Sequence, residues 1–190
     1  MHDVAYALFA TSLGTCGIAW GAGGIVAVQL PEASESATVQ RLLRGRQADG
    51  WQAAGRQGPG PEQQQIVHDI VALLAGRPRD LRYARLDFSQ VPPFHQRVFA
   101  LVRAIAPGQT RSYGEVAALC GDRQAARAVG QAMARNPFPI IVPCHRVLAA
   151  GGRSGGFSAA GGVTTKRRLL TIEGALGAVS DPAGTMSLAF

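Results

Sequence analysis

The chain opens with hydrophobic runs that predict β-strands. Two apolar runs, 13–20 and 25–30, are joined by Gly21-Ala22-Gly23-Gly24, and a glycine-rich joint between such runs is typical of a hairpin. Residues 31–60 are polar and rich in Gly and Gln, with one short helical stretch near 39–43. The pattern therefore predicts a few strands near the N-terminus and little regular structure after them.

A helix is predicted to begin at Pro61, since proline suits the first turn of a helix, and to end before Gly76. Its apolar face is formed by Ile66, Val67, Ile70, Val71 and Leu74. Strands followed by a helix indicate a small α/β domain over residues 1–85. Nothing in this part of the sequence looks catalytic, so we interpret the domain as a scaffold.

Beyond residues 77–93, which we interpret as a linker, the hydrophobic spacing is helical. The positions that form one stripe of an amphipathic helix are Phe94, Val98, Leu101, Val102 and Ile105. Ala106-Pro107-Gly108 ends that helix. A second domain, over residues 91–175, is therefore expected to be mainly helical.

Two short helices are predicted next. Ser112 and Glu115 form a capping box at the start of the first helix, which ends at Gly121. Asp122 caps the second helix, which runs to about Arg135. Two short helices joined by a tight Gly-Asp turn are compatible with a helix-turn-helix, the arrangement that many DNA-binding proteins use.

The second of these helices has an almost bare surface around Arg127. Its small residues are Ala125, Ala126, Ala128, Gly130 and Ala132. A bare helix can approach another surface closely. That surface could be a neighbouring helix or a shallow groove of a nucleic acid.

The segment after these helices holds the most distinctive residues. Ile140-Ile141-Val142 is a β-branched run suited to a buried strand, and it leads into Pro143-Cys144-His145-Arg146-Val147. A loop with six glycines follows, up to Gly162. A last helix is predicted over 164–173, with Gly174 as its C′ residue.

Composition narrows the class of protein. No apolar stretch approaches the roughly 18 residues of a membrane span, and the N-terminus has no signal-peptide pattern, so we expect a cytoplasmic protein that does not bind a membrane. Cys16, Cys120 and Cys144 are too few and too scattered for a disulfide framework or a zinc site. We therefore expect neither a metal nor another cofactor, and residues 176–190 are expected to form a disordered tail.

The net charge of +7 is unevenly distributed. Residues 1–90 hold eight Arg and eight acidic residues, whereas residues 91–175 hold ten Arg, one Lys and three acidic residues. A GC-rich genome would explain Arg in preference to Lys, but it would not explain the segregation. Charge concentrated in one half favours a polyanionic partner for that half.

Cys144, His145 and Glu173 supply the groups of an activated thiol. A free thiol has a pKa of about 8.5, an imidazole can take its proton, and a carboxylate can support the resulting imidazolium. Neighbours on an extended strand point to opposite faces, so His145 would reach the sulfur only through a water or if the backbone turns here. A buried, unreactive cysteine and a thiol hydrolase remain alternatives on the chemistry alone.

The context of Cys144 resembles a known family. The chain is similar to the O6-alkylguanine-DNA alkyltransferases, also called methylated-DNA–protein-cysteine methyltransferases, from about Pro92 through Gly174. The matching motifs are Gly108-Gln-Thr-Arg-Ser-Tyr113, Arg127-Ala-Val-Gly-Gln-Ala-Met-Ala-Arg-Asn-Pro-Phe-Pro-Ile-Ile-Val-Pro-Cys-His-Arg-Val147 and Leu169-Leu-Thr-Ile-Glu-Gly174. The resemblance implies an α+β protein: a small ribonuclease-H-like α/β domain, then a mainly helical, winged-helix-like domain with the helix-turn-helix.

The resemblance also implies a reaction. Cys144 would accept the alkyl group from O6-alkylguanine, with His145 as its base through a water and Glu173 behind the imidazole. Asn136 would brace the turn before the site, and the Tyr113 hydroxyl would return a proton to the guanine. A thioether is chemically inert, so each chain would act once.

DNA contacts are implied in the same way. The helix that carries Ala126, Ala128 and Gly130 would enter the minor groove of double-stranded DNA. Arg127 would fill the space left by the flipped nucleotide, and Tyr113 would help to rotate the backbone. The protein would act as a monomer.

The resemblance further implies the contacts of the guanine. The carbonyls of Cys144 and Val147 would read its amino group, the amide of Ser158 would contact O6, and Lys166 matches a lysine near the active-site loop. One departure is an apparent insertion of Ala159-Ala160 before the last helix, with Phe157 in place of the usual Tyr. We expect the loop 155–162 to influence which adducts fit. A lesion-binding module without catalysis is the alternative function, although such relatives replace the acceptor cysteine.

Overall fold

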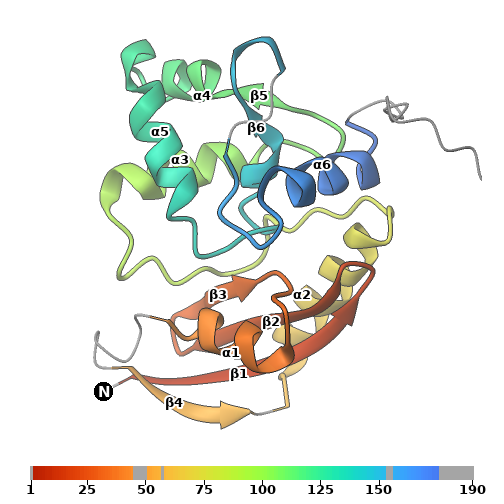
Figure 1. Ribbon diagram of the computed structural model, residues 1–190. Coiled ribbons are helices and arrows are strands. Elements are labelled where there is room, and N and C mark those ends of the chain that lie inside the picture. The colour runs from red at the N-terminus through yellow and green to blue at the C-terminus, as the bar shows by residue number, and fades with distance from the viewer. Residues whose placement is uncertain (1, 45–50, 57, 153–155, 176–190) are drawn as a thin grey trace, which may run out of the picture.

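The computed structural model describes residues 2–44, 51–56, 58–152 and 156–175 of the chain (Figure 1). It is a mixed α/β protein in which a sheet-containing N-terminal half lies against a mainly helical C-terminal half. The tail expected over 176–190 lies outside the described residues. No helix within the described ranges is both long enough and apolar enough to cross a membrane.

The N-terminal half is built on a four-stranded sheet in the order β3-β2-β1-β4. Its strands are β1 (His2–Thr11), β2 (Gly14–Gly21), β3 (Gly24–Gln29) and β4 (Trp51–Arg56). The first three form an antiparallel meander, and β4 pairs parallel to β1. The predicted hairpin is confirmed, whereas β4 lies in the polar segment in which no strand was predicted.

One helix covers each face of this sheet. Side chains alternate across a strand, so Cys16 and Ile18 of β2 pack with Ile66 of α2 (Pro61–Leu74), whereas Ala19 packs with Leu42 of α1 (Glu35–Leu42). The bounds of α2 agree with the prediction. The other helix begins four residues earlier than expected, because Ser34 caps it.

The C-terminal half packs short helices around a second part of the core. Its elements are α3 (Pro93–Arg103), β5 (Arg111–Ser112), α4 (Tyr113–Leu119), α5 (Ala126–Ala134), β6 (Val147–Leu148) and α6 (Gly162–Ile172). The capping box of Ser112 and Glu115 is present at the start of α4. Asp122 caps a 3-10 turn that runs directly into α5, so the second helix of the predicted pair is a 3-10 turn followed by an α-helix.

The strand predicted over residues 140–142 is wrong. These residues are buried, but they lie in turns, and Ile140 has a φ of 75°, which is rare for a β-branched residue. The amide of Val142 donates to the carbonyl of Phe138 at 2.8 Å, and Asn136 bonds to both ends of the same turn. An apolar run indicates burial but does not by itself distinguish a strand from a buried turn.

The two halves share one hydrophobic core. A single cluster of buried side chains extends from Ile18 of β2 through Phe99 of α3 to Leu169 of α6. The segment 77–93, predicted as a linker, buries Leu81, Ala84 and Leu86 in that core.

The outer edge of β3 is bonded to the rest of the chain. The amide of Ile25 donates to the carbonyl of Arg85, and the amide of Asp87 donates to the carbonyl of Ile25, both at 2.8 Å. The amide of Val28 donates to the carbonyl of Pro137 at 2.9 Å, seven residues before Cys144. These bonds fix the scaffold half against the segment that carries the candidate site.

Candidate active site

Cys144 opens a 3-10 helical turn, Cys144–Arg146, that follows the buried turn at residues 140–142. The residue is 6% exposed, and a hydrogen bond from the side chain of Asn136 acts to lower the pKa of its thiol, against the larger effect of burial. Asn136 also donates to the carbonyl of Val142 at 2.8 Å and accepts from the amide of Phe138 at 2.9 Å. One amide side chain therefore fixes the backbone before Cys144 and contacts the sulfur.

His145 and Glu173 form a buried pair beside Cys144. His145 is fully buried, and its Nε2 lies 3.0 Å from Oε1 of Glu173, which caps the C-terminal end of α6. The Nδ1 atom of His145 is buried and has no partner among the described residues. Neither ring nitrogen bonds to the sulfur, so the turn of the backbone does not bring the imidazole into direct hydrogen-bond contact with the thiol.

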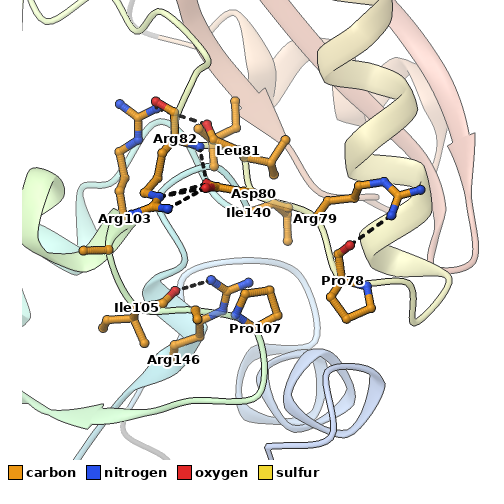
Figure 2. Close-up of a pocket in the computed structure, with 13 residues that line it drawn as sticks. Pro78, Arg79, Asp80, Leu81, Arg82, Arg103, Ile105, Pro107, Ile140 and Arg146 are labelled. Atoms are coloured by element: carbon orange, nitrogen blue, oxygen red, sulfur yellow. Dashed lines mark hydrogen bonds and ion pairs between the residues drawn. The ribbon is translucent and has the colours of Figure 1, made fainter.

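Arg146 completes this cluster and was not predicted as a site residue. It is 4% exposed, and it donates from Nε and Nη2 to the two oxygens of Glu173 at 2.8 and 2.7 Å. Its Nη1 donates to the carbonyl of Ile105 at 2.5 Å (Figure 2). The sequence signal for it was an arginine four residues after a run that was predicted to be buried, since a buried arginine requires a partner.

Arg146 and His145 set the charge of Glu173. Burial raises the pKa of this carboxyl, but the hydrogen bonds from Arg146 and then from His145 outweigh burial and bring it to about 2. Glu173 is therefore ionised at neutral pH. Its charge is shared between a permanent cation and an imidazole that can gain a proton.

Burial keeps Cys144 and His145 neutral in the resting protein. It raises the pKa of the Cys144 thiol, against the opposing effects of Asn136 and Lys166. It also lowers the pKa of His145, against the opposing effect of Glu173. A thiol and a neutral imidazole side by side are a donor and an acceptor between which one proton can move when a substrate arrives.

Lys166, on α6, is fully buried, and its Nζ donates to the carbonyl of Val147 at 2.6 Å. Burial lowers its pKa, and the nearby Cys144 opposes that effect. The ammonium also lies 5.8 Å from the centre of the Tyr113 ring. Lys166 thus contacts a carbonyl predicted to bind guanine and does not project into open space. The Cys144 carbonyl likewise accepts from the Val147 amide, and each carbonyl retains a second lone pair.

A cavity of about 470 Å³ opens at Cys144 between α4, α5 and the loop before α6. Tyr113, Gly130, Met133, Phe157 and Ser158 are among the residues that line it. Burial and then Cys144 raise the pKa of Tyr113, so its hydroxyl keeps its proton. The structure therefore places predicted site residues from four segments around one cavity.

Helix α5 presents Arg127 to solvent and its apolar residues to the core. Val129, Ala132 and Met133 are buried, whereas Ala126, Ala128 and Gly130 are half-buried. A Cβ placed at Gly130 would lie 4.0 Å from the Tyr113 ring. The side chain of Arg127 has no hydrogen bond or ion pair among the described residues.

The loop before α6 is hydrogen-bonded both to α1 and to the first turns of α6. Ser158 is exposed, and its carbonyl accepts from Nη2 of Arg41 of α1 at 2.7 Å. The inserted pair forms the turn that leads into α6, since the carbonyl of Ala159 accepts from the amide of Gly162 at 3.0 Å and that of Ala160 accepts from the hydroxyl of Thr165 at 2.6 Å. The influence of this loop on adduct choice stays a prediction.

Other candidate sites are less informative. A cavity of about 310 Å³ lies behind Arg146, bordered by Arg79, Asp80 and Arg103, but Cys144 does not line it (Figure 2). Among the described residues, no three His, Cys, Asp or Glu side chains are grouped so that they could hold a metal ion.

Comparison with known proteins identifies relatives of this chain. Residues 93–175 match the family model for the 6-O-methylguanine DNA methyltransferase DNA-binding domain. The chain is 32% identical over 158 residues to the methylated-DNA–protein-cysteine methyltransferase of Methanothermobacter thermautotrophicus, which covers 83% of this chain and 78% of that protein.

Solved structures are similar over almost the whole chain. The crystal structure of Mycobacterium tuberculosis O6-methylguanine methyltransferase has a TM-score of 0.70 at 32% identity and covers 90% of this chain and 93% of its own. The structure of the M. tuberculosis protein in complex with DNA has a TM-score of 0.64 at 30% identity, over the same shares of the two chains.

Proposed function

The chain belongs to the methylated-DNA–protein-cysteine methyltransferase family and repairs DNA by alkyl transfer to a cysteine, and we propose that this cysteine is Cys144. The observation that carries the assignment is the position of Cys144 on a cavity, directly beside the buried pair of His145 and Glu173. Neither Cys16 nor Cys120 lines that cavity. Burial raises the pKa of Cys16 to about 11, which makes it a poor nucleophile.

The transfer is a displacement at the alkyl carbon. The Cys144 thiol gives its proton, through a bridging water, to Nδ1 of His145, whose other nitrogen is held by Glu173. The thiolate forms a bond to the alkyl carbon, and the bond from that carbon to guanine O6 breaks with its electron pair. The guanine then takes up one proton, for which the Tyr113 hydroxyl is the donor, and the proton held by His145 returns through solvent to the tyrosinate. The products are a thioether and normal guanine, with no cofactor consumed.

Three charged residues assist the transfer without contacting the alkyl group. Arg146 fixes the orientation of Glu173, and Glu173 stabilises the imidazolium that forms on His145. The positive charge of Lys166 favours the thiolate of Cys144. Lys166 also holds the Val147 carbonyl, which together with the Cys144 carbonyl and the Ser158 amide would contact the guanine.

DNA reaches the cavity along α5. The proposal places this helix in the minor groove, with the half-buried Ala126, Ala128 and Gly130 allowing close approach and the exposed Arg127 filling the gap of the flipped nucleotide. The charge of +8 in residues 91–175 supports binding to phosphates. Flipping costs a few kcal/mol, less for a weakly paired alkylated guanine.

The finer classification of the fold belongs to the same proposal. The sheet order β3-β2-β1-β4 supports a ribonuclease-H-like N-terminal domain over residues 1–85. The pairing of β5 with β6 beside α4 and α5 supports a winged-helix-like domain over residues 91–175. We further propose that the protein acts as a monomer in the cytoplasm.

Titration of the protein against duplex DNA that contains O6-methylguanine tests the central assignment. We expect at most one lesion removed per chain, with a methyl group found on Cys144 by intact mass and peptide mapping. Cys144→Ser should remove the transfer, whereas Cys120→Ser should leave it unchanged. Turnover of many lesions per chain would indicate a hydrolase, and binding without any mass change would indicate a lesion-binding module.

A further inference from the structure

The cavity behind Arg146 takes no part in the proposed reaction. It measures about 310 Å³ and lies between the segment 78–82 and the turn 103–107, and Cys144 does not line it. Figure 2 shows the two segments facing each other across the space, with Arg146 beside the second one. Since Arg146 also binds Glu173, this cavity and the acceptor site share one side chain.

Arginines supply most of the charge in this cavity. Its charged residues are Arg79, Asp80, Arg82, Arg103 and Arg146. Three of the four arginines are each bound to one carboxylate, at 3.2, 2.6 and 2.7 Å, and those partners are Asp69, Asp80 and Glu173. Arg103 has no carboxylate within hydrogen-bond distance among the described residues. The cavity therefore retains one positive charge that the described chain does not balance.

The guanidinium of Arg103 is only partly satisfied. Its Nη2 donates to the carbonyls of Leu81, Arg82 and Ala84 at 3.1, 2.8 and 2.9 Å. Its Nε is buried and has no hydrogen-bond partner in the part of the chain that the structure describes, and its Nη1 has none there either. Burial lowers the pKa of Arg103, because a cation is less well solvated there. An anion in the cavity would offset that cost.

Arg146 supplies free donors on another side of the cavity. A guanidinium carries five N–H groups, and those of Arg146 that the fold uses are one on Nε, one on Nη1 and one on Nη2. One N–H on each terminal nitrogen is left for a ligand. Arg103 reaches carbonyls of the segment 81–84, whereas Arg146 reaches that of Ile105, so the two guanidiniums approach the cavity from different sides.

The arrangement of these donors indicates the class of ligand. A carboxylate presents both oxygens on one planar edge, whereas a phosphate group presents oxygens in several directions and can bond to guanidiniums on two sides at once. The rest of the lining is apolar and includes Leu81, Ile105, Pro107 and Ile141, so it suits a small organic group attached to the phosphate. DNA is not expected here, because no residue of α5 lines the cavity.

We infer that this cavity binds the phosphate group of a small molecule, and that binding promotes alkyl transfer at Cys144. The site itself is independent of the proposed function, because it uses neither the acceptor thiol nor the residues of α5. The coupling to transfer rests on the proposed function, because it acts through Glu173 and His145.

The coupling passes through Arg146. A phosphate in contact with its guanidinium would take up part of the positive charge that Glu173 now shares. The carboxylate would then act more strongly on His145, at 3.0 Å, and the imidazolium that receives the thiol proton would be favoured. Bound phosphate should therefore raise the pKa of His145 and speed the transfer about fivefold, the lower end of the usual range for coupled sites.

Two substitutions at the cavity should change phosphate affinity in opposite directions. Asp80→Asn removes the carboxylate that occupies the Arg82 guanidinium, which becomes available to a ligand, while the amide oxygen can still accept from the Arg82 backbone. Ala106→Glu adds a carboxylate at an exposed lining position, and Ala106→Gln is its uncharged match. Neither position belongs to the acceptor site.

Calorimetric titration with inorganic phosphate and with phenyl phosphate, at constant ionic strength in sodium chloride, measures the affinities. We expect binding to be about threefold tighter in Asp80→Asn and about threefold weaker in Ala106→Glu, sizes typical of one exposed charge pair. Ala106→Gln should bind as the wild type does. Phenyl phosphate should bind more tightly than inorganic phosphate, because its ring covers apolar lining.

The rate of transfer from free O6-benzylguanine to Cys144 measures the coupling, and this substrate avoids competition from DNA phosphates. We expect phenyl phosphate to accelerate the reaction about fivefold in the wild type, with its half-maximal effect at the dissociation constant found by calorimetry. In Ala106→Glu the half-maximal effect should move to a concentration about threefold higher.

The outcomes separate the site, its coupling and the proposed function. Equal affinities in all four proteins, with melting temperatures preserved, would overturn the site, since phosphate would then be held elsewhere on the basic surface. Altered affinities without any change in rate would overturn the coupling. Weaker binding of an unmodified duplex by Ala106→Glu than by Ala106→Gln would show that the cavity takes a DNA phosphate, and would overturn the assignment to a small molecule. A wild type that binds phosphate but takes no alkyl group would instead contradict the proposed function.

Discussion

Glu173 concentrates the electrostatics of the site in one carboxylate. Two bonds from Arg146 and one from His145 hold it at the end of α6, with its side chain 3% exposed. A carboxylate in this setting can keep its charge although it is buried, because each oxygen has a charged or polar partner. Its protonation would release Arg146 and His145 together, so the site should be sensitive to acid.

Glu173→Gln should change how stability depends on pH. The pKa of Glu173 is about 2 in the folded protein against an ordinary value of 4.5, so its ionised form contributes stability above pH 4.5 that is lost as the pH falls toward 2. The difference corresponds to about 3 kcal/mol. The variant should therefore be less stable at pH 7 and should show a flatter decline in unfolding free energy between pH 5 and 2.

Urea unfolding at pH 7, 4.5 and 3 measures this effect. Glu62→Gln, at the exposed start of α2, is the control and should follow the wild type. Protonation of His145 also destabilises the folded protein in acid, because burial lowers the pKa of this residue. The comparison is therefore between the pH curves of the variants and not between absolute slopes. Parallel pH curves for Glu173→Gln and the wild type would contradict the assigned role of the carboxylate.

At the scale of residues, the sequence located the chemical groups but not all of their partners. Cys144, His145, Asn136 and Glu173 stood in a motif specific enough to be identified, and the structure brings all four together. Arg146 was overlooked because its partners, Ile105 and Glu173, lie 41 and 27 residues away in the chain. Pairing over such separations depends on the tertiary fold, which a local pattern does not describe.

At the scale of elements, prediction succeeded where a local physical signal existed. The capping box that Ser112 forms at the start of α4 and the proline at the start of α2, Pro61, act through their immediate neighbours in the sequence. Both helix starts were predicted correctly. The run at residues 140–142 was misassigned because its burial comes from the core and its turn from Asn136. Strand β4 was missed because its pairing with β1 joins segments some fifty residues apart.

Helix α5 offers an element-scale test of DNA recognition. If Arg127 fills the gap of a flipped nucleotide, Arg127→Ala should slow repair of duplex O6-methylguanine about tenfold or more, equivalent to roughly 1.4 kcal/mol of barrier. Reaction with free O6-benzylguanine needs no flipping and should keep its rate. The two rates are measured under single-turnover conditions at saturating DNA.

Arg123→Ala is the matched control, since it removes another exposed arginine, from the 3-10 turn that precedes α5. Its loss should be confined to DNA affinity and should disappear at saturation. Equal losses for Arg127→Ala on duplex and free base would mean that Arg127 acts in some way other than flipping.

At the scale of the whole molecule, the acceptor site and the scaffold are parts of one packed body. The core cluster includes Cys144 together with side chains of β2, α2 and α6. The Pro137 carbonyl bonded to β3 and the Arg41 side chain bonded to Ser158 connect the two halves on either side of the acceptor. A change at the sulfur should therefore be felt in the stability of the entire chain.

Methylation of Cys144 should lower the melting temperature. The added methyl group overpacks a buried position and weakens the sulfur as an acceptor for the Asn136 amide, at a typical cost of about 1–3 kcal/mol. For a chain of this size that corresponds to a shift of several degrees. Calorimetry before and after reaction measures it, with Cys144→Ser exposed to the same DNA as the control, and an unchanged or higher melting temperature would count against the prediction.

The hydrogen bonds on the outer edge of β3 also bear on whether the alkylated protein self-associates. An edge strand with free amides and carbonyls is a template on which other chains can pair, and here Arg85, Asp87 and Pro137 occupy that edge. Loss of these bonds would expose the apolar strand Gly24–Gln29 along one side. Chains that have already reacted would then be the first to self-associate, so turbidity in a repaired sample would report the fraction of spent molecules.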